Sequence, residues 1–116
     1  MINFDDFWFQ GYKEGSLMNA QENENSYLVE LRAVGVKKED IKINFEDDVL
    51  VVKSENKKAS EQPKWLRREF HKDTIDKRII VPGDSDRDNV KARVEDGILV
   101  IEIPKLESKK SVILVE

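Results

Sequence analysis

The sequence contains no cysteine and only one histidine, His71, among its 116 residues. Without cysteine, neither a disulfide nor a thiolate metal site can form, and redox chemistry at sulfur is excluded. A metal site would need carboxylates for every ligand except one imidazole, and a nucleophile paired with a base would depend on that same imidazole. We therefore expect His71 to lie at the surface or at a strand edge rather than to bind metal or catalyse.

Clustered glycines and long apolar runs are also missing. The five glycines are dispersed and never form a phosphate-cradling loop, so a nucleotide cofactor is not expected. The longest apolar runs are far shorter than a membrane span. The first seven residues lack the basic region and cleavage site of a secretory signal. These features predict a cytoplasmic protein that is not an enzyme and has no cofactor or metal.

Charge of both signs is abundant. Charged residues make up 38% of the chain and apolar residues 39%, with a net charge of -4 and a pI near 5.2. The charged share exceeds the usual roughly one quarter, so much of the chain is expected to face water. The slight acidic excess provides no positive field to attract nucleic acid or anionic lipid, so neither nucleic acid nor membrane is an expected partner.

Composition divides the chain, which has the size of one domain, into three parts. Residues 1–15 form an aromatic N-terminal arm, residues 16–105 a central domain, and residues 106–116 a C-terminal extension. The domain contains short β-like runs between turn signals, at residues 17–21, 27–33, 41–45, 49–53, 74–81, 91–94 and 98–103. Several runs alternate and none keeps a helical period, which predicts an all-β, immunoglobulin-like sandwich of two layers.

The most informative stretch spans residues 90–105. Residues 90–95 alternate between apolar and polar, Asp96 and Gly97 supply a turn with a positive-φ position, and an apolar run follows until Pro104. This pattern is typical of a β-hairpin whose return strand is buried.

This hairpin resembles the signature of the α-crystallin domain of small heat-shock proteins. The resemblance covers residues 17–105, with further matching pieces at residues 27–31, 35–43, 49–52 and 79–82. Two positions depart from the family pattern. Val34 stands where a proline is common, and Lys77 stands where an arginine is typical. The resemblance implies a dimer contact at Lys77, although a lysine cannot form the bidentate ion pair of an arginine.

The resemblance implies an ATP-independent holding chaperone. Such a protein binds partly unfolded clients and works as dimers assembled into a larger homo-oligomer. Two other functions fit a similar fold. One is a monomeric co-chaperone or adaptor of the p23-like and CS type, and the other is a structural protein that assembles with copies of itself.

The C-terminal extension ends in an apolar run. In an extended segment alternate side chains face the same way, so Ile113 and Val115 form one pair about 7 Å apart, and Val112 and Leu114 form another. The resemblance favours Ile113 and Val115 as the assembly motif. It implies that they dock on a neighbouring subunit, in a groove lined by Ile41, Ile43, Phe45, Ala92 and Val94. The alternative is a frayed or self-pairing last strand.

Residues 53–64 form a polar stretch that is long for a hairpin turn, and Trp65 and Leu66 follow it. In relatives of the non-animal type, the equivalent loop reaches a neighbouring subunit. The resemblance therefore implies a dimer in which Trp65 and Leu66 lie near Leu17 and Met18 of the partner subunit. The alternative is an ordinary mobile surface loop.

The N-terminal arm holds five of the nine aromatic residues, namely Phe4, Phe7, Trp8, Phe9 and Tyr12. Aromatic side chains gain most by covering apolar surface on a partly unfolded protein, so we expect this arm to bind clients and to support assembly. The alternative is that the arm packs on its own domain.

Overall fold

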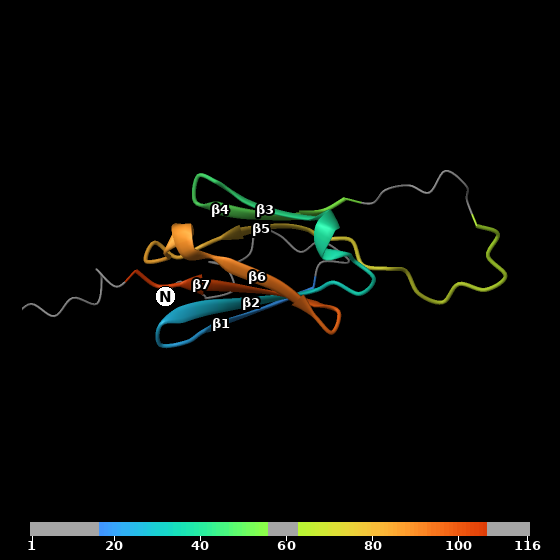
Figure 1. Ribbon diagram of the computed structural model, residues 1–116, viewed down its shortest axis with the longest axis horizontal. Helices are drawn as coiled ribbons and strands as arrows, with labels where there is room; N and C mark the ends of the chain where they lie inside the picture. The colour runs from blue at the N-terminus through green and yellow to red at the C-terminus, as the bar shows by residue number, and fades with distance from the viewer. Residues whose placement is uncertain (1–16, 56–62, 107–116) are drawn as a thin grey trace, which may run out of the picture.

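The computed structural model describes residues 17–55 and 63–106, which form two antiparallel sheets packed face to face (Figure 1). One sheet has the strand order β1-β2-β7-β6 and the other has the order β3-β4-β5. The strands are β1 Met18–Glu22, β2 Ser26–Arg32, β3 Ile41–Glu46, β4 Val49–Ser54, β5 Asp76–Ile80, β6 Lys91–Glu95 and β7 Ile98–Pro104. Short 3-10 helices, η1 Lys38–Asp40 and η2 Arg87–Asn89, precede β3 and β6.

The two-layered β-sandwich predicted from the sequence is confirmed, and each predicted run overlaps one strand. The largest difference concerns residues 74–81, of which only Asp76–Ile80 form a strand. Just before β5, the backbone N–H of Ile75 donates to the hydroxyl of Ser54 at 2.8 Å instead of to a main-chain carbonyl. The backbone N–H of Ser54 still donates to the carbonyl of Ile75 at 2.8 Å, so a side chain replaces one of the two ladder bonds at this end of β5 and the strand begins at Asp76.

The core forms where the inward faces of the two sheets meet. In β2, buried residues alternate with less buried ones, as a strand with one face on the core requires. The central strands β4 and β7 instead each contain three consecutive buried residues. The largest fully buried side chains are Leu31, Leu50, Ile75, Ile79, Leu99, Ile101, Ile103, Val29 and Val52.

The hairpin predicted at residues 90–105 is confirmed as the β6–β7 pair. Glu95 faces Ile98 across the turn, and Asp96 and Gly97 between them have φ values of 52° and 76°. Two successive positive φ angles match the twist of the flanking strands, and glycine adopts this conformation without steric cost. The turn sequence therefore fixes the register in which β6 lies beside β7.

The edges of the two sheets position the surfaces that matter for function. β3 and β6 are edge strands of different sheets, and Figure 1 shows η1 and η2 at opposite ends of the space between them. Residues 63–72 project from the body as an extended segment (Figure 1). Two features are therefore candidates for interaction sites: the space between the edge strands β3 and β6, and the projecting segment 63–72.

Candidate interaction sites

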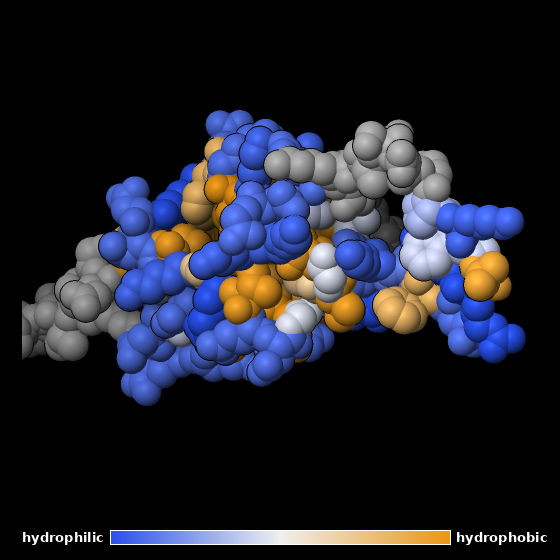
Figure 2. Space-filling view, turned by 45° about the vertical axis from the view of Figure 1, so that its right-hand side comes forward, coloured by the Kyte–Doolittle hydropathy of each residue, from blue (hydrophilic) through white to orange (hydrophobic). Residues whose placement is uncertain are grey.

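A cavity of about 200 Å³ lies between the edge strands β3 and β6. Its lining is mostly aliphatic and comprises Lys38, Ile41, Ile43, Ala92, Arg93, Val94 and Leu99. In β3 the isoleucines are half-buried while the intervening polar residues are exposed, so the alternation turns one apolar face toward β6. Figure 2 shows apolar surface in the middle of the body, between hydrophilic layers above and below.

The structure brings together four of the five residues expected to form a groove: Ile41, Ile43, Ala92 and Val94 line this one cavity. A cavity of about 150 Å³ is known to hold a benzene ring, so this space is large enough for a branched aliphatic side chain. Its chemistry suits an apolar, extended ligand rather than a polar small molecule.

Phe45, which the resemblance also places in the groove, is not among the residues that line the cavity. The guanidinium of Arg87 lies over the Phe45 ring, 5.3 Å from its centroid. Arg87 also donates hydrogen bonds to the backbone carbonyl of Asp47 and to the carboxylate of Asp48. Phe45 is therefore covered on its outer side and packs against the core.

Lys38, Arg93 and Leu99 line the cavity although the sequence did not identify them. The pattern of apolar residues does not identify Lys38 and Arg93, because their long aliphatic stems reach the cavity while their charged ends stay near water. The guanidinium of Arg93 also pairs with Glu95 at 3.3 Å. Leu99 could have been identified, since it lies directly opposite the groove residue Val94 in the β6–β7 hairpin.

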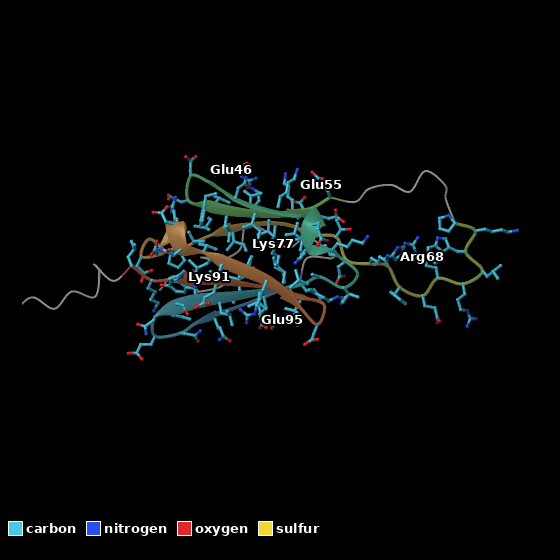
Figure 3. All side chains as sticks on the ribbon, in the orientation of Figure 1. Glu46, Glu55, Arg68, Lys77, Lys91 and Glu95 are labelled. Carbon is cyan, nitrogen blue, oxygen red and sulfur yellow. The ribbon has the colours of Figure 1, made fainter. Side chains whose placement is uncertain are left out.

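The projecting segment presents a second apolar surface. Trp65, Leu66 and Phe70 are 56%, 95% and 74% exposed in the single chain. The guanidinium of Arg68 stacks over the Trp65 ring at 4.6 Å from its centroid, and Figure 3 shows Arg68 well away from the body. The exposed apolar area of these side chains is available to be covered by a second molecule.

The edge strand β1 carries the residues expected to receive this segment. Leu17, just before β1, is 46% exposed, and Met18 packs partly against the core. Both lie at the free side of the four-stranded sheet, since β1 is paired with β2 and is the last strand at this edge. An exposed edge strand is a common site for pairing with another chain.

Lys77 is poorly placed for the dimer contact expected of it. It lies on β5, opposite Val52, and is only 5% exposed within its own chain. Figure 3 shows it among the side chains between the two sheets. Burial lowers the pKa of its amine below the ordinary lysine value. Little of this side chain is available to a partner subunit.

A buried carboxylate that the sequence did not reveal fixes the base of the projecting segment. Asp73 accepts hydrogen bonds from Nε of Arg32, at 3.0 and 3.2 Å, and from the backbone N–H of Val34 at 2.7 Å. Its own backbone N–H donates to the carbonyl of Val34 at 2.8 Å. These contacts, which we call the Asp73 clamp, join segments about forty residues apart, so no local pattern could reveal them.

His71 is exposed on the projecting segment, as expected for a surface histidine. Within residues 17–55 and 63–106, no three His, Cys, Asp or Glu side chains are grouped so as to hold a metal ion. The same residues contain no helix that is long and apolar enough to span a membrane.

The expected client-binding and assembly residues at the two ends of the chain lie outside the described residues. In the N-terminal arm they are Phe4, Phe7, Trp8, Phe9 and Tyr12, and in the C-terminal extension they are Ile113 and Val115.

Comparison with known sequences gives several relatives. A small heat shock protein of pea (Pisum sativum) chloroplasts is 39% identical over 83 residues, which cover 71% of this chain and 35% of the relative. A probable Hsp20 family chaperone of Onion yellows phytoplasma is 29% identical over 111 residues, covering 87% of this chain and 81% of the relative. The chain thus spans about a third of the plant relative and most of the bacterial one.

Solved structures share the fold. A small heat-shock protein from Xylella fastidiosa superimposes with a TM-score of 0.71 at 22% identity, covering 87% of this chain and 91% of the other. A truncated form of the small heat shock protein AgsA from Salmonella typhimurium gives a TM-score of 0.68 at 21% identity, covering 87% and 95%.

The broadest of these similarities is to a whole family. The sequence model described as the Hsp20/alpha crystallin family matches residues 19–116, which include all seven strands except the first residue of β1. The matched region contains the hairpin, the edge strands of the cavity and the C-terminal extension. The chain therefore belongs to the Hsp20/alpha crystallin family of small heat-shock proteins.

Proposed function

We propose that this protein is an ATP-independent holding chaperone that binds partly unfolded proteins and keeps them from aggregating. The observation that carries the proposal is the apolar cavity between the edge strands β3 and β6, on the fold of a small heat-shock protein. An apolar space beside two strand edges suits an extended, apolar chain segment, whose side chains it can bury and whose backbone it can pair. Such binding requires no chemical turnover.

The occupant at rest is the C-terminal extension of another subunit, through Ile113 and Val115. Leu106 lies seven residues beyond the cavity residue Leu99, or roughly 23 Å along the chain. Its backbone N–H donates to the carbonyl of Asp84 at 2.7 Å, which fixes this end of the strand. Ile113 lies seven residues further, so a return to the same cavity would need an immediate reversal and a fully stretched chain. A neighbouring subunit is easier to reach.

Each such contact is weak by itself. Burial of an isoleucine and a valine side chain contributes about 1.5–3 kcal/mol each, before the cost of ordering the segment is subtracted. One docked segment is therefore expected to dissociate readily, whereas many docked at once hold an assembly together. This combination allows subunits to separate when the temperature rises.

The basic unit of the assembly is a dimer in which Trp65 and Leu66 lie on Leu17 and Met18 of the partner subunit. The exposure of these side chains and the edge position of β1 support this arrangement.

Clients bind mainly through the aromatic arm once subunits separate, because its aromatic residues cover apolar surface on a partly unfolded chain.

Light scattering of a heat-labile enzyme warmed with the protein tests this function. At an equal number of subunits, we expect strong suppression of aggregation that does not change when ATP is added. A triple variant Phe7→Ser, Trp8→Ser and Phe9→Ser should retain its β-sheet signal and lose most of the suppression. Aggregation at the rate of the enzyme alone would refute the proposal.

A further inference from the structure

Beyond the cavity, at the hairpin end of β3, a single side chain joins the edges of the two sheets. Arg87 belongs to η2, which leads into β6, yet it contacts the Phe45 ring of β3 and, in the β3–β4 turn, the carbonyl of Asp47 and the carboxylate of Asp48. Figure 1 shows η2 beside the β3–β4 hairpin, at the end of β3 away from η1. Arg87 therefore crosses from one sheet edge to the other.

The position of Arg87 is itself fixed by η2. The carboxylate of Asp86 accepts hydrogen bonds from the backbone N–H of Asp88 at 3.2 Å and from the side chain of Asn89 at 2.8 Å. The backbone N–H of Asp86 donates to the carbonyl of Pro104, at the end of β7, at 2.7 Å. These bonds hold the turn against the four-stranded sheet, so the guanidinium is presented to the hairpin from a supported base.

This crossing determines how much of β3 remains accessible. Three side chains of β3 point inward, Ile41, Ile43 and Phe45, and only the first two line the cavity. Inward side chains follow one another at about 7 Å along a strand. The cavity thus ends about one inward side chain before the β3–β4 hairpin, at the ring that Arg87 covers.

We propose that Arg87 sets the length of the groove, and thereby selects segments with two apolar side chains over segments with three. This inference rests on the proposed function, in that the occupant is the C-terminal extension of a second copy. The sequence of that extension fits a shortened groove. Positions 111, 113 and 115 share one face when extended, and they are Ser111, Ile113 and Val115. Two apolar side chains are preceded by a polar one.

The charges indicate which end of the segment faces Arg87. Lys38 lines the cavity at the η1 end, away from Arg87. Glu116 directly follows Val115, so a segment that runs toward η1 brings a negative charge to the end of the groove that Lys38 lines. The side chain of Glu116 leaves the strand on the face opposite to Val115, so the attraction acts at long range and not through a contact. In this direction Ser111 faces the closed end, beside Arg87 and Asp48, where a hydroxyl can be hydrogen-bonded and a larger apolar side chain has no space.

Peptide binding to the full chain tests the proposal. The acceptor carries Ile113→Gly and Val115→Gly so that its own extensions do not compete, and it is compared with and without Arg87→Ala. The probes are fluorescent peptides of residues 107–116, with the natural sequence or with Ser111→Leu, and the readout is anisotropy. We expect the Ser111→Leu peptide to bind about tenfold more tightly when Arg87→Ala is present, corresponding to the burial of one further apolar side chain. The natural peptide should change less than about threefold.

Arg78→Ala is the matched control. Arg78 also pairs with a carboxylate near the β3–β4 hairpin, that of Glu46 at 2.9 Å, but it lies on β5 of the same sheet as Glu46 and so does not join the two sheets. It should leave both peptides unaffected. If Arg87→Ala does not fold, Asp48→Ala, at a largely exposed residue, should give a smaller gain in the same direction.

Equal affinity of the Ser111→Leu peptide for acceptors with and without Arg87→Ala would overturn the role of Arg87. Failure of the natural peptide to bind any acceptor would overturn tail docking itself, and the role of Arg87 with it.

Discussion

At the scale of single residues, two buried polar side chains make stability depend on pH in different ranges. Burial lowers the pKa of Lys77, so the folded state carries a cost for its charge at neutral pH, and this cost disappears as pH rises toward the ordinary lysine value. Burial, and then the hydrogen bond and charge of Asp84, raise the pKa of Tyr27. Its contribution to stability is complete below the ordinary tyrosine pKa of about 10 and is lost above it.

Replacement of Lys77 by methionine should therefore stabilise the protein at pH 7. We expect a gain of about 1 kcal/mol, or roughly 4 °C in melting temperature, that shrinks as pH approaches 10. Thermal unfolding followed by circular dichroism at pH 7 and pH 10 measures both values. The control is Lys42→Met, at an exposed residue paired with Glu55, which should give no gain. A lower melting temperature for Lys77→Met would show that the buried amine makes net favourable interactions.

Replacement of Tyr27 by phenylalanine removes the hydrogen bond from the tyrosine hydroxyl to Asp84, which is 2.7 Å long. Because the acceptor is a carboxylate, we expect a loss of about 1.5–3 kcal/mol in the free energy of unfolding at pH 8. Between pH 9 and pH 11 the unaltered protein should lose stability faster than the variant, since only it contains the titrating hydroxyl. Urea unfolding across this range measures the difference. Parallel curves for the two proteins would contradict the assignment.

Single residues also show where sequence reasoning reaches its limit. The inward positions Ile41, Ile43, Ala92 and Val94 follow from alternation, which is a local property of a strand. The Phe45 ring, in contrast, is covered by the side chain of Arg87, which lies more than forty residues later in the sequence. The depth at which Lys77 lies depends on how the second sheet covers it. Such long-range contacts leave no periodic signal.

At the scale of elements, the projecting segment 63–72 depends on how its base is held. The Asp73 clamp ties it to the turn after β2, where Gly35 has a φ of 77°. A Cβ at Gly35 would lie 2.6 Å from Cγ of Lys72, so glycine is required both by the backbone and by the close approach of the segment. The sequence predicted a polar loop at residues 53–64, just before this segment, but not the attachment of its base, because strand patterns do not describe loop contacts.

Replacement of Asp73 by asparagine should loosen the base of the segment. We expect a loss of about 1–2 kcal/mol, mainly from the weakened hydrogen bond to the backbone of Val34, since Arg32 is largely exposed and its ion pair is screened. Hydrogen exchange should rise in residues 63–76 and remain unchanged in β7. The exposed Asp88→Asn is the control. Unchanged exchange in residues 63–76 would show that other contacts hold the segment.

The same segment allows a test of the proposed dimer. Leu66 is almost fully exposed in the single chain, so Leu66→Asp should not affect folding, but it would place a charge in the contact with the partner subunit. We expect dimer dissociation to become at least about tenfold easier, as measured by analytical ultracentrifugation of the Ile113→Gly, Val115→Gly background. Ile98→Asp, at an exposed apolar residue on the β6–β7 hairpin, is the control. An unchanged dimer would exclude Leu66 from the interface.

At the scale of the whole molecule, the proposed assembly combines a two-layered β-sandwich with weak contacts made by the ends of the chain. The sandwich and its hairpins could be predicted because turn residues and alternation specify them locally. The proposed contacts between subunits could be inferred only from the resemblance to the family. In a single chain, the features that correspond to them are exposed apolar side chains on residues 63–72 and the cavity between β3 and β6. Many weak contacts of this kind produce assemblies that exchange subunits.

Native mass spectrometry of the purified particle at low and elevated temperature tests whether C-terminal extensions hold the assembly together. The intact chain should form particles of many subunits that shift toward smaller species on heating. With Ile113→Gly and Val115→Gly it should collapse to dimers of twice the 13.5 kDa chain mass at both temperatures. Single copies of the intact chain at every concentration, or a variant as large as the intact particle, would contradict assembly through captured C-terminal extensions.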